Sequence, residues 1–230
     1  MSVAIDQTIE IAGVRHYLAR AAAPTTTGVL LLPHVYGIDE FVRDFADRLA
    51  QRGLTTLAWN PYPDLPMGAA FTDRPPRPND GATVKTLSGC LDVMDKDLGL
   101  GAVATIGFCM GARFALVFGA HEPRLRAAVA CYPSIPAQRS PGQDVEPVPA
   151  AAGIACPVQL VYPGQDRVTA RPTFRALQAM LQGRSVETSI LYYPNAEHGF
   201  MHTPSPVNDA ATRSALPQIY AFLETHLTTA

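Results

Sequence analysis

The 230-residue sequence is short of several features that mark particular classes of protein. Its four cysteines (Cys90, Cys109, Cys131 and Cys156) show neither the paired spacing of metal sites nor the density of a disulfide framework. No basic stretch indicates nucleic-acid binding, no acidic tail indicates disorder, and the net charge is only −2. The start of the chain does not resemble a signal peptide, and no apolar run approaches the length of a membrane span. We therefore expect a soluble cytoplasmic protein with reduced thiols, no metal, and no nucleic-acid or membrane partner.

What is present is enough apolar sequence for one packed core, since 47 % of the residues are hydrophobic. Apolar runs typical of buried strands alternate with segments of helical periodicity, after a short hairpin at residues 7–18. This alternation predicts an α/β fold with a mostly parallel, doubly wound sheet and helices on both faces, in a single domain over residues 1–230. The expected strands are 28–32, 54–58, 102–106, 126–131, 158–162 and 186–193, and the expected helices are 40–52, 84–98, 113–120, 169–181 and 208–227, with Pro217 a kink or restart in the last helix.

Two long proline-rich stretches interrupt this order, at residues 60–81 and 132–157. Each follows an expected strand, so both should emerge at the carboxyl edge of the sheet. Irregular stretches of this length in a compact domain are commonly functional, and their prolines stiffen them. We expect them to form the walls of a pocket, the alternative being surface loops without a role.

The segment Gly107-Phe108-Cys109-Met110-Gly111 lies between an expected strand and an expected helix. A nucleophile flanked by small residues at such a junction is typical of the nucleophile elbow of α/β-hydrolases, with Cys in the place usually held by Ser. The glycines permit a sharp turn, and the N-terminus of the following helix favours a thiolate over a thiol. The alternative interpretation is a buried structural cysteine.

Two further residues complete a possible catalytic set. Asp166 follows the strand expected at 158–162, and His198 follows the strand expected at 186–193. The order nucleophile, acid, base is that of the α/β-hydrolase triad. The chemistry needs all three types, because the imidazole takes the thiol proton while the carboxylate orients it and stabilises its cation. We therefore predict Cys109, His198 and Asp166 as catalytic residues.

With these motifs, the chain resembles the dienelactone hydrolase family over nearly its whole length. The resemblance rests on the Gly-x-Cys-x-Gly segment, Gly164-Gln165-Asp166, Glu197-His198-Gly199-Phe200, and the segment from Leu32 to Gly37. It implies a hydrolase that opens lactones or cleaves small esters through a thioester acyl-enzyme, without a cofactor. It also implies an oxyanion hole from the backbone N–H groups of Met110 and Val35. That assignment agrees with the general pattern of one donor after the nucleophile and one in the loop after an early strand.

The sequence departs from the family pattern at two positions. The dienelactone enzymes carry a Glu in the early loop, where this chain has His34. A cationic His34 would favour the Cys109 thiolate even without substrate, whereas the simpler interpretation is a loop residue that lines the pocket. Those enzymes also hold a substrate carboxylate with arginines, and His202 stands where one of them is expected. Arg74 and Arg77 could supply another cation or be solvated loop charges, so we expect weaker anion recognition.

Three aromatic residues, Tyr36, Trp59 and Phe200, are expected either in the substrate pocket or in the core. The predicted partner is a small-molecule lactone or ester, and the protein is expected to be a monomer or a small homo-oligomer. Three rival functions remain open: acyl transfer to an alcohol or thiol on the same triad, a non-catalytic ligand-binding role, and a redox role for Cys109. The redox role has the least support, because no Cys-x-x-Cys motif or neighbouring cysteine is visible.

Overall fold

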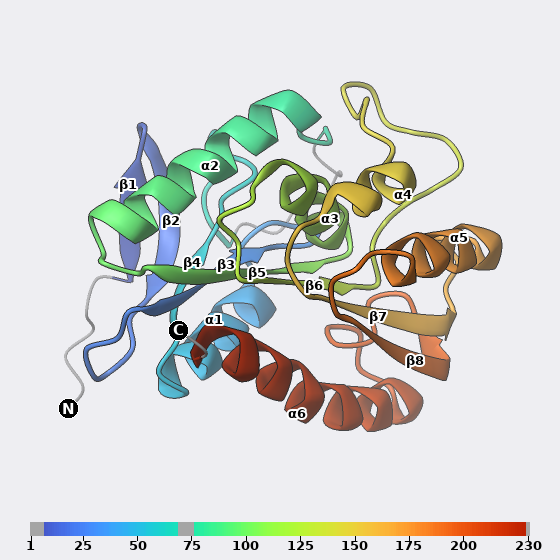
Figure 1. Ribbon diagram of the computed structural model, residues 1–230. Helices are drawn as coiled ribbons and strands as arrows, with labels where there is room; N and C mark the ends of the chain where they lie inside the picture. The colour runs from blue at the N-terminus through green and yellow to red at the C-terminus, as the bar shows by residue number, and fades with distance from the viewer. Residues whose placement is uncertain (1–6, 69–75, 229–230) are drawn as a thin grey trace.

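The computed structural model describes residues 7–68 and 76–228, and its centre is one sheet flanked by helices (Figure 1). The sheet has the strand order β1-β2-β4-β3-β5-β6-β7-β8. β1 pairs antiparallel with β2, and β2 with β4, whereas the pairings from β4 across to β8 are parallel. The strands are β1 (Thr8–Ile11), β2 (Val14–Ala19), β3 (Thr27–Leu32), β4 (Thr55–Ala58), β5 (Ala102–Phe108), β6 (Ala127–Cys131), β7 (Val158–Gln165) and β8 (Thr188–Glu197). The predicted α/β fold with a mostly parallel sheet is confirmed.

Helices cover both faces of the sheet, as expected for a parallel sheet whose connections are helical. In Figure 1, α1 (Glu40–Gln51) and α6 (Pro206–Thr228) lie below the sheet. Above it lie α2 (Asp80–Lys96), α3 (Met110–His121), α4 (Pro147–Ala150) with the 3₁₀ turn η1 (Ala151–Gly153), and α5 (Arg171–Gln182). Among the described helices, none has both the length and the apolar composition that a membrane span requires.

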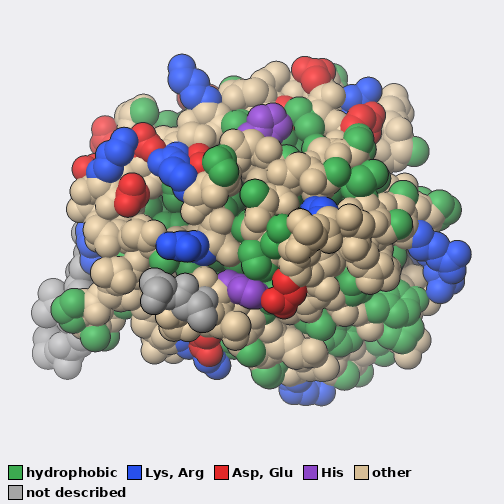
Figure 2. All heavy atoms as spheres, viewed as in Figure 1, with side chains coloured by type: hydrophobic (Ala, Val, Ile, Leu, Met, Phe, Trp, Pro, Cys, Tyr) green, Lys and Arg blue, Asp and Glu red, His purple; other side chains and the backbone are tan. Residues whose placement is uncertain are grey.

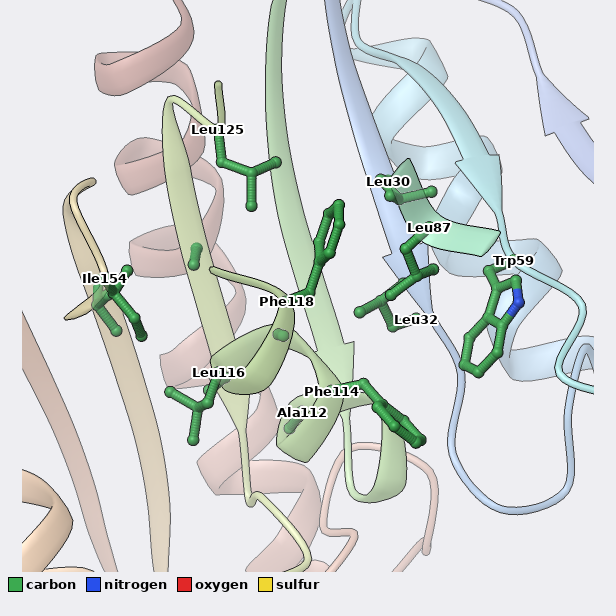
Figure 3. Close-up of a cluster of buried hydrophobic side chains, with 14 of the residues drawn as sticks. Leu30, Leu32, Trp59, Leu87, Ala112, Phe114, Leu116, Phe118, Leu125 and Ile154 are labelled. Atoms are coloured by element: carbon green, nitrogen blue, oxygen red, sulfur yellow. The ribbon is translucent and has the colours of Figure 1, made fainter. Parts of the chain in front are cut away.

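Strand β3 shows why the central strands read as uninterrupted apolar runs. Leu30 and Leu32 belong to the buried cluster on the side of α2 and α3, whereas Val29 and Leu31 belong to the cluster on the side of α1 and α6. Figure 3 shows Leu30 and Leu32 beside the aromatic side chains from α3. Because alternate residues of a strand point to opposite faces, a strand covered on both faces needs apolar residues at every position.

Helix starts follow their capping residues. Asp39 Oδ1 accepts the Val42 N–H at 3.0 Å, so α1 begins where the sequence predicts. Helix α2 begins at Asp80, four residues before the predicted start at Val84, because Asn79 Oδ1 accepts the Ala82 N–H at 3.0 Å. Pro217 lies inside α6, so the last helix does not restart there.

The two proline-rich stretches differ from the expectation in part. The second contains α4 and η1 and is therefore not wholly irregular. Pro147 stands at the start of α4, a position that tolerates proline because its missing N–H would have no helical partner. In the first stretch, residues 69–75 lie outside the described residues, and its end forms the first turn of α2.

Candidate active site

Cys109 lies at a tight turn between β5 and α3. Its φ is +51° and its ψ −108°, a strained backbone conformation for a residue with a side chain. A Cβ atom on Gly107 would collide with the Gly111 carbonyl, and one on Gly111 would collide with the Leu32 carbonyl. The expected elbow is present, and both glycines of Gly-x-Cys-x-Gly are required by close backbone contacts.

Backbone hydrogen bonds hold the Cys109 backbone in this conformation. The Cys109 N–H donates to the Cys131 carbonyl at 3.0 Å, at the end of the neighbouring strand β6. The Cys109 carbonyl accepts the N–H groups of Ser134 at 3.0 Å and Arg113 at 3.1 Å. The strain is thus offset by three bonds that involve only the main chain.

Asp166 and His198 form a buried hydrogen-bonded pair at the ends of β7 and β8. His198 Nδ1 lies 2.8 Å from Asp166 Oδ2, and the Asp166 side chain is fully buried. Asp166 Oδ1 accepts the N–H groups of Val168 at 2.7 Å and Thr169 at 2.9 Å, which fix the carboxylate. An acceptor at Nδ1 places the imidazole proton on that nitrogen and leaves Nε2 for another partner.

The remaining partner of His198 is the Cys109 sulfur. Nε2 of His198 is buried and has no well-formed hydrogen bond to the described residues, and its interaction with Cys109 is therefore looser than that of Nδ1 with Asp166. Burial lowers the pKa of His198, but the bonds and charges of Asp166 and Cys109 outweigh it and raise the pKa to about 9. Sulfur and imidazole therefore favour the charged pair.

The Cys109 thiol differs from the other three cysteines. Burial raises its pKa, but His198, the charge of Arg77 and the Met110 N–H together bring the pKa below its ordinary value. Burial alone raises the pKa of Cys90 to about 12, and it raises the pKa of Cys156 to about 11 against a small opposing charge from Arg184. The environment therefore favours a thiolate at Cys109 and a neutral thiol elsewhere.

These groups open onto a pocket of about 440 Å³ at the carboxyl edge of the sheet. A hollow of about 390 Å³ lies at the amino ends of β5 and β6 and contains none of these side chains. The described residues lining the pocket are His34, Val35, Tyr36, Asp39, Arg77, Cys109, Ser134, Val168, His198, His202 and Thr203. The pocket therefore contains sulfur, three imidazoles, one carboxylate and one guanidinium.

His34 is almost fully buried in the wall of this pocket. Its Nδ1 accepts the Tyr36 N–H at 3.2 Å. Among the described residues, the ion-pair partner of its Nε2 is Asp39 Oδ2, at 3.1 Å. With Nδ1 as the acceptor, the ring presents Nε2 to Asp39 and not to the Cys109 sulfur. The charges of His198 and Arg77 lower the pKa of Cys109. An effect of a cationic His34 on the thiolate stays a prediction.

His202 also lines the pocket as a neutral group. Burial, the neighbouring His34 and the charge of His198 lower its pKa to about 3, against a small opposing effect of Asp39. Its Nδ1 lies 3.2 Å from the Tyr132 hydroxyl. An uncharged imidazole cannot replace an arginine that grips a carboxylate.

The other expected site residues are divided between pocket and core. Val35, Tyr36 and Arg77 line the pocket. Trp59 is buried against Phe114, and Phe200 is buried beside Tyr132, which corrects the expectation that either lines the pocket. Both aromatics are more than nine-tenths buried among apolar neighbours, where packing alone accounts for them. Arg74 lies outside the described residues.

Sequence reasoning missed two interactions that hold the site together. The Tyr62 hydroxyl donates to the Val35 carbonyl at 3.0 Å and lies 3.6 Å from the Met110 sulfur. Arg113 forms a buried bidentate pair with Asp80, at 2.5 and 2.9 Å, and also donates to the carbonyl of Val145. No sequence motif signals either interaction, because the partners are distant in the chain and ordinary in type.

Metal ligands and surface charge can be examined for the part of the chain that the structure describes. In residues 7–68 and 76–228, no cluster of His, Cys, Asp and Glu could hold a metal ion. Figure 2 shows Lys and Arg side chains interspersed with Asp and Glu over the visible face.

The parallel sheet, the strained turn after β5 and the histidine beyond the last strand define the class of this protein, the α/β-hydrolases. A profile of the "Dienelactone hydrolase family" matches residues 14–227, so the chain belongs to that family and is a hydrolase.

Individual relatives agree with this assignment. The chain is 29 % identical over 202 residues to the "Putative carboxymethylenebutenolidase" of Escherichia coli K12, covering 80 % of this chain and 71 % of the relative. It is 26 % identical over 223 residues to the "Carboxymethylenebutenolidase" of Rhodococcus opacus, covering 90 % and 85 %. The crystal structure of a "Putative Dienelactone Hydrolase" from Klebsiella pneumoniae has the same fold, with a TM-score of 0.81 at 24 % identity over 94 % of this chain and 96 % of that one.

Proposed function

We propose that this hydrolase opens lactones or cleaves small esters with Cys109 as nucleophile, His198 as acid and base, and Asp166 as the group that orients His198. The observation that carries the proposal is the 2.8 Å Asp166–His198 pair next to a cysteine whose pKa is lowered, in one pocket. Burial alone would have raised that pKa. The charges of His198 and Arg77 therefore stabilise the thiolate, which is the reactive form of the sulfur.

The reaction follows from this arrangement. The Cys109 thiolate attacks the carbonyl carbon, forming a C–S bond while the carbonyl oxygen becomes an oxyanion, which the N–H groups of Met110 and Val35 stabilise. The tetrahedral intermediate then collapses, the bond to the leaving oxygen breaks, and His198 protonates that oxygen, leaving a thioester. His198 next takes a proton from water, the resulting hydroxide attacks the thioester carbon, and the thiolate leaves as the carboxylic acid forms.

The backbone supports this role for Val35. Among the described residues, the Val35 N–H donates to no acceptor, and the residue lines the same pocket as Cys109. The Met110 N–H, at the start of α3, interacts with the Cys109 sulfur. Two donors near the nucleophile are what a tetrahedral oxyanion requires.

The charged groups of the pocket determine which net charge of substrate it can accommodate. Arg77 is a half-buried cation that makes no ion pair with the described residues, whereas His202 is neutral and Asp39 brings a carboxylate into the same pocket. Among the described lining residues, a substrate carboxylate would therefore meet one guanidinium. We propose a neutral or singly charged lactone or ester as substrate.

The test is turnover of a panel containing a dienelactone, a neutral lactone and p-nitrophenyl acetate, with acid-quenched intermediates examined by mass spectrometry. Wild type should carry an acyl group on Cys109, and Cys109→Ala should lose at least about 1,000-fold in kcat/KM. Cys156→Ala, another buried cysteine, is the matched control and should keep its activity. No turnover of any substrate, with no acyl adduct, would contradict hydrolysis and favour a ligand-binding role.

The same panel refines the substrate class. Arg77→Gln should raise KM about tenfold for the anionic dienelactone and leave neutral esters unchanged. If the dienelactone is turned over no faster than p-nitrophenyl acetate, a dienelactone is not the preferred substrate. The assignment as an ester hydrolase would remain. Added alcohols that capture the acyl group in place of water would identify an acyltransferase.

Three further expectations stay predictions. They are a cytoplasmic location, a monomer or small homo-oligomer, and a single domain over residues 1–230.

A further inference from the structure

The turn after β3 leaves one of three consecutive N–H groups unused. The Gly37 N–H donates to the His34 carbonyl at 3.0 Å, which closes a four-residue turn. The Tyr36 N–H donates to His34 Nδ1 at 3.2 Å. The Val35 N–H, between these two, has no acceptor among the described residues. The bonds that shape the turn therefore leave the N–H group of Val35, a residue that lines the pocket, without a partner among the described residues.

The side chain of His34 acts here as asparagine or aspartate side chains do at the first position of such turns. Those residues accept the N–H two positions ahead and so fix the turn. His34 Nδ1 makes the same contact with Tyr36. The imidazole thus fixes the Val35–Tyr36 peptide, while the Gly37 N–H fixes the carbonyl of the His34–Val35 peptide that carries the Val35 N–H.

The ring itself is held from several sides. Nε2 of His34 lies 3.1 Å from Asp39 Oδ2, a contact bent away from ideal hydrogen-bond geometry, while Asp39 Oδ1 caps α1. The rings of His202 and Phe41 lie 4.4 and 5.9 Å from it between centroids. Since one nitrogen accepts from the backbone and the other faces Asp39, neither is free to exchange a proton with substrate.

A second contact fixes the same peptide from its carbonyl side. The Tyr62 hydroxyl donates to the Val35 carbonyl and lies against the Met110 sulfur. Val35 and Met110 are the residues whose N–H groups we assign to the oxyanion. A single buried hydroxyl therefore contacts both donor residues.

We propose that His34, braced by Asp39, is a positioning residue that holds the Val35 N–H in place for the oxyanion. The proposal rests on the function proposed above. It differs from the idea of a cationic His34 acting on the thiolate, because it predicts an effect on the stabilisation of the tetrahedral intermediate and none on the sulfur.

The experiment compares His34→Asn with His34→Leu, two side chains of nearly the same shape. Asn Oδ1 can accept the Tyr36 N–H as His34 Nδ1 does, whereas Leu cannot. With p-nitrophenyl acetate, His34→Leu should lower kcat about 10- to 100-fold at nearly unchanged KM, since a misplaced oxyanion donor costs most of its contribution. His34→Asn should recover kcat to within about threefold of wild type.

Alkylation of Cys109 by iodoacetamide, measured on the same samples, separates the possible roles. Both variants should be alkylated within about twofold of the wild-type rate, which also shows that the elbow and His198 are intact. Three outcomes would each overturn the positioning role. They are an equal loss of kcat in the two variants, an unchanged kcat in His34→Leu, and an alkylation rate that falls in parallel with kcat. Absence of an acyl adduct in wild type would instead overturn the proposed function. The turn would then have no oxyanion to stabilise.

Discussion

Two turns bring backbone N–H groups to the pocket, and they are held in different ways. The turn around Cys109 is fixed by main-chain contacts: two glycines with no room for a Cβ and three backbone hydrogen bonds to the cysteine. The turn around Val35 is fixed in part by side chains, the His34 imidazole and the Tyr62 hydroxyl. The contacts that hold the first turn involve no side chain, whereas those that hold the second can be altered one side chain at a time.

This difference explains which part of the site was visible in the sequence. Steric demands of the backbone select glycine at defined spacing, and such spacing is a readable motif. A turn held by side chains can be built from several residue types that accept an N–H. The second turn is also where the sequence analysis expects a departure from the family pattern, at His34.

Gly111→Ala should break the first turn altogether. The added Cβ would overlap the Leu32 carbonyl, which is backbone in the central strand and cannot move aside. We expect a loss of more than about 4 kcal/mol in the free energy of unfolding, or no folded protein, in urea denaturation followed by circular dichroism. Gly89→Ala is the control, because a Cβ there meets nothing within 4 Å inside α2, and it should stabilise by up to about 1 kcal/mol. Equal stability of the two variants would contradict the steric account.

His198→Asn tests the charged pair at the elbow. In wild type, the lowered pKa of Cys109 keeps a thiolate present below the ordinary thiol range, and the imidazolium persists until the pH rises through about 9. Without the imidazole, burial should dominate and raise the Cys109 pKa, so the iodoacetamide rate at pH 7 should fall at least about tenfold.

The measurement is the alkylation rate from pH 5 to 10. In the variant, the rate should rise only at alkaline pH, while in wild type it should already be high at neutral pH. His121→Asn, at the far end of α3, is the control and should keep the wild-type profile. A variant profile that coincides with wild type would mean that the helix start and Arg77 suffice.

Tyr62→Phe should have the smallest effect, because it removes one hydrogen bond of the second turn and a longer contact with Met110. It removes the hydroxyl that holds the Val35 carbonyl, so kcat should fall about three- to tenfold, the value of one buried hydrogen bond. Steady-state kinetics with p-nitrophenyl acetate measures it. Tyr17→Phe loses a hydroxyl bonded to Gln7 and Asp47, away from the pocket, and should leave kcat unchanged. A change in KM with constant kcat would place Tyr62 in ground-state binding instead.

Much of the fold was predictable because its signals are local. Continuous apolar runs marked the central strands, since a strand buried on both faces is mostly apolar. The start of α2 was missed, because its cap Asn79 lies within a proline-rich stretch that reads as a loop. Residue type could not separate pocket aromatics from core aromatics, and Tyr36 is half exposed at the pocket while Trp59 and Phe200 are buried.

The sequence by itself determined the elbow and the chain order of cysteine, aspartate and histidine at three strand ends, because glycine sterics and strand periodicity act over a few residues. Only the tertiary structure decided the contact of His34 with the Tyr36 N–H, the Tyr62 contact with both Val35 and Met110, and the buried Arg113–Asp80 pair. Each of these depends on burial or on a partner brought close by folding, and burial changes the energy of a charge or an unpaired polar group in ways that no short segment of sequence records.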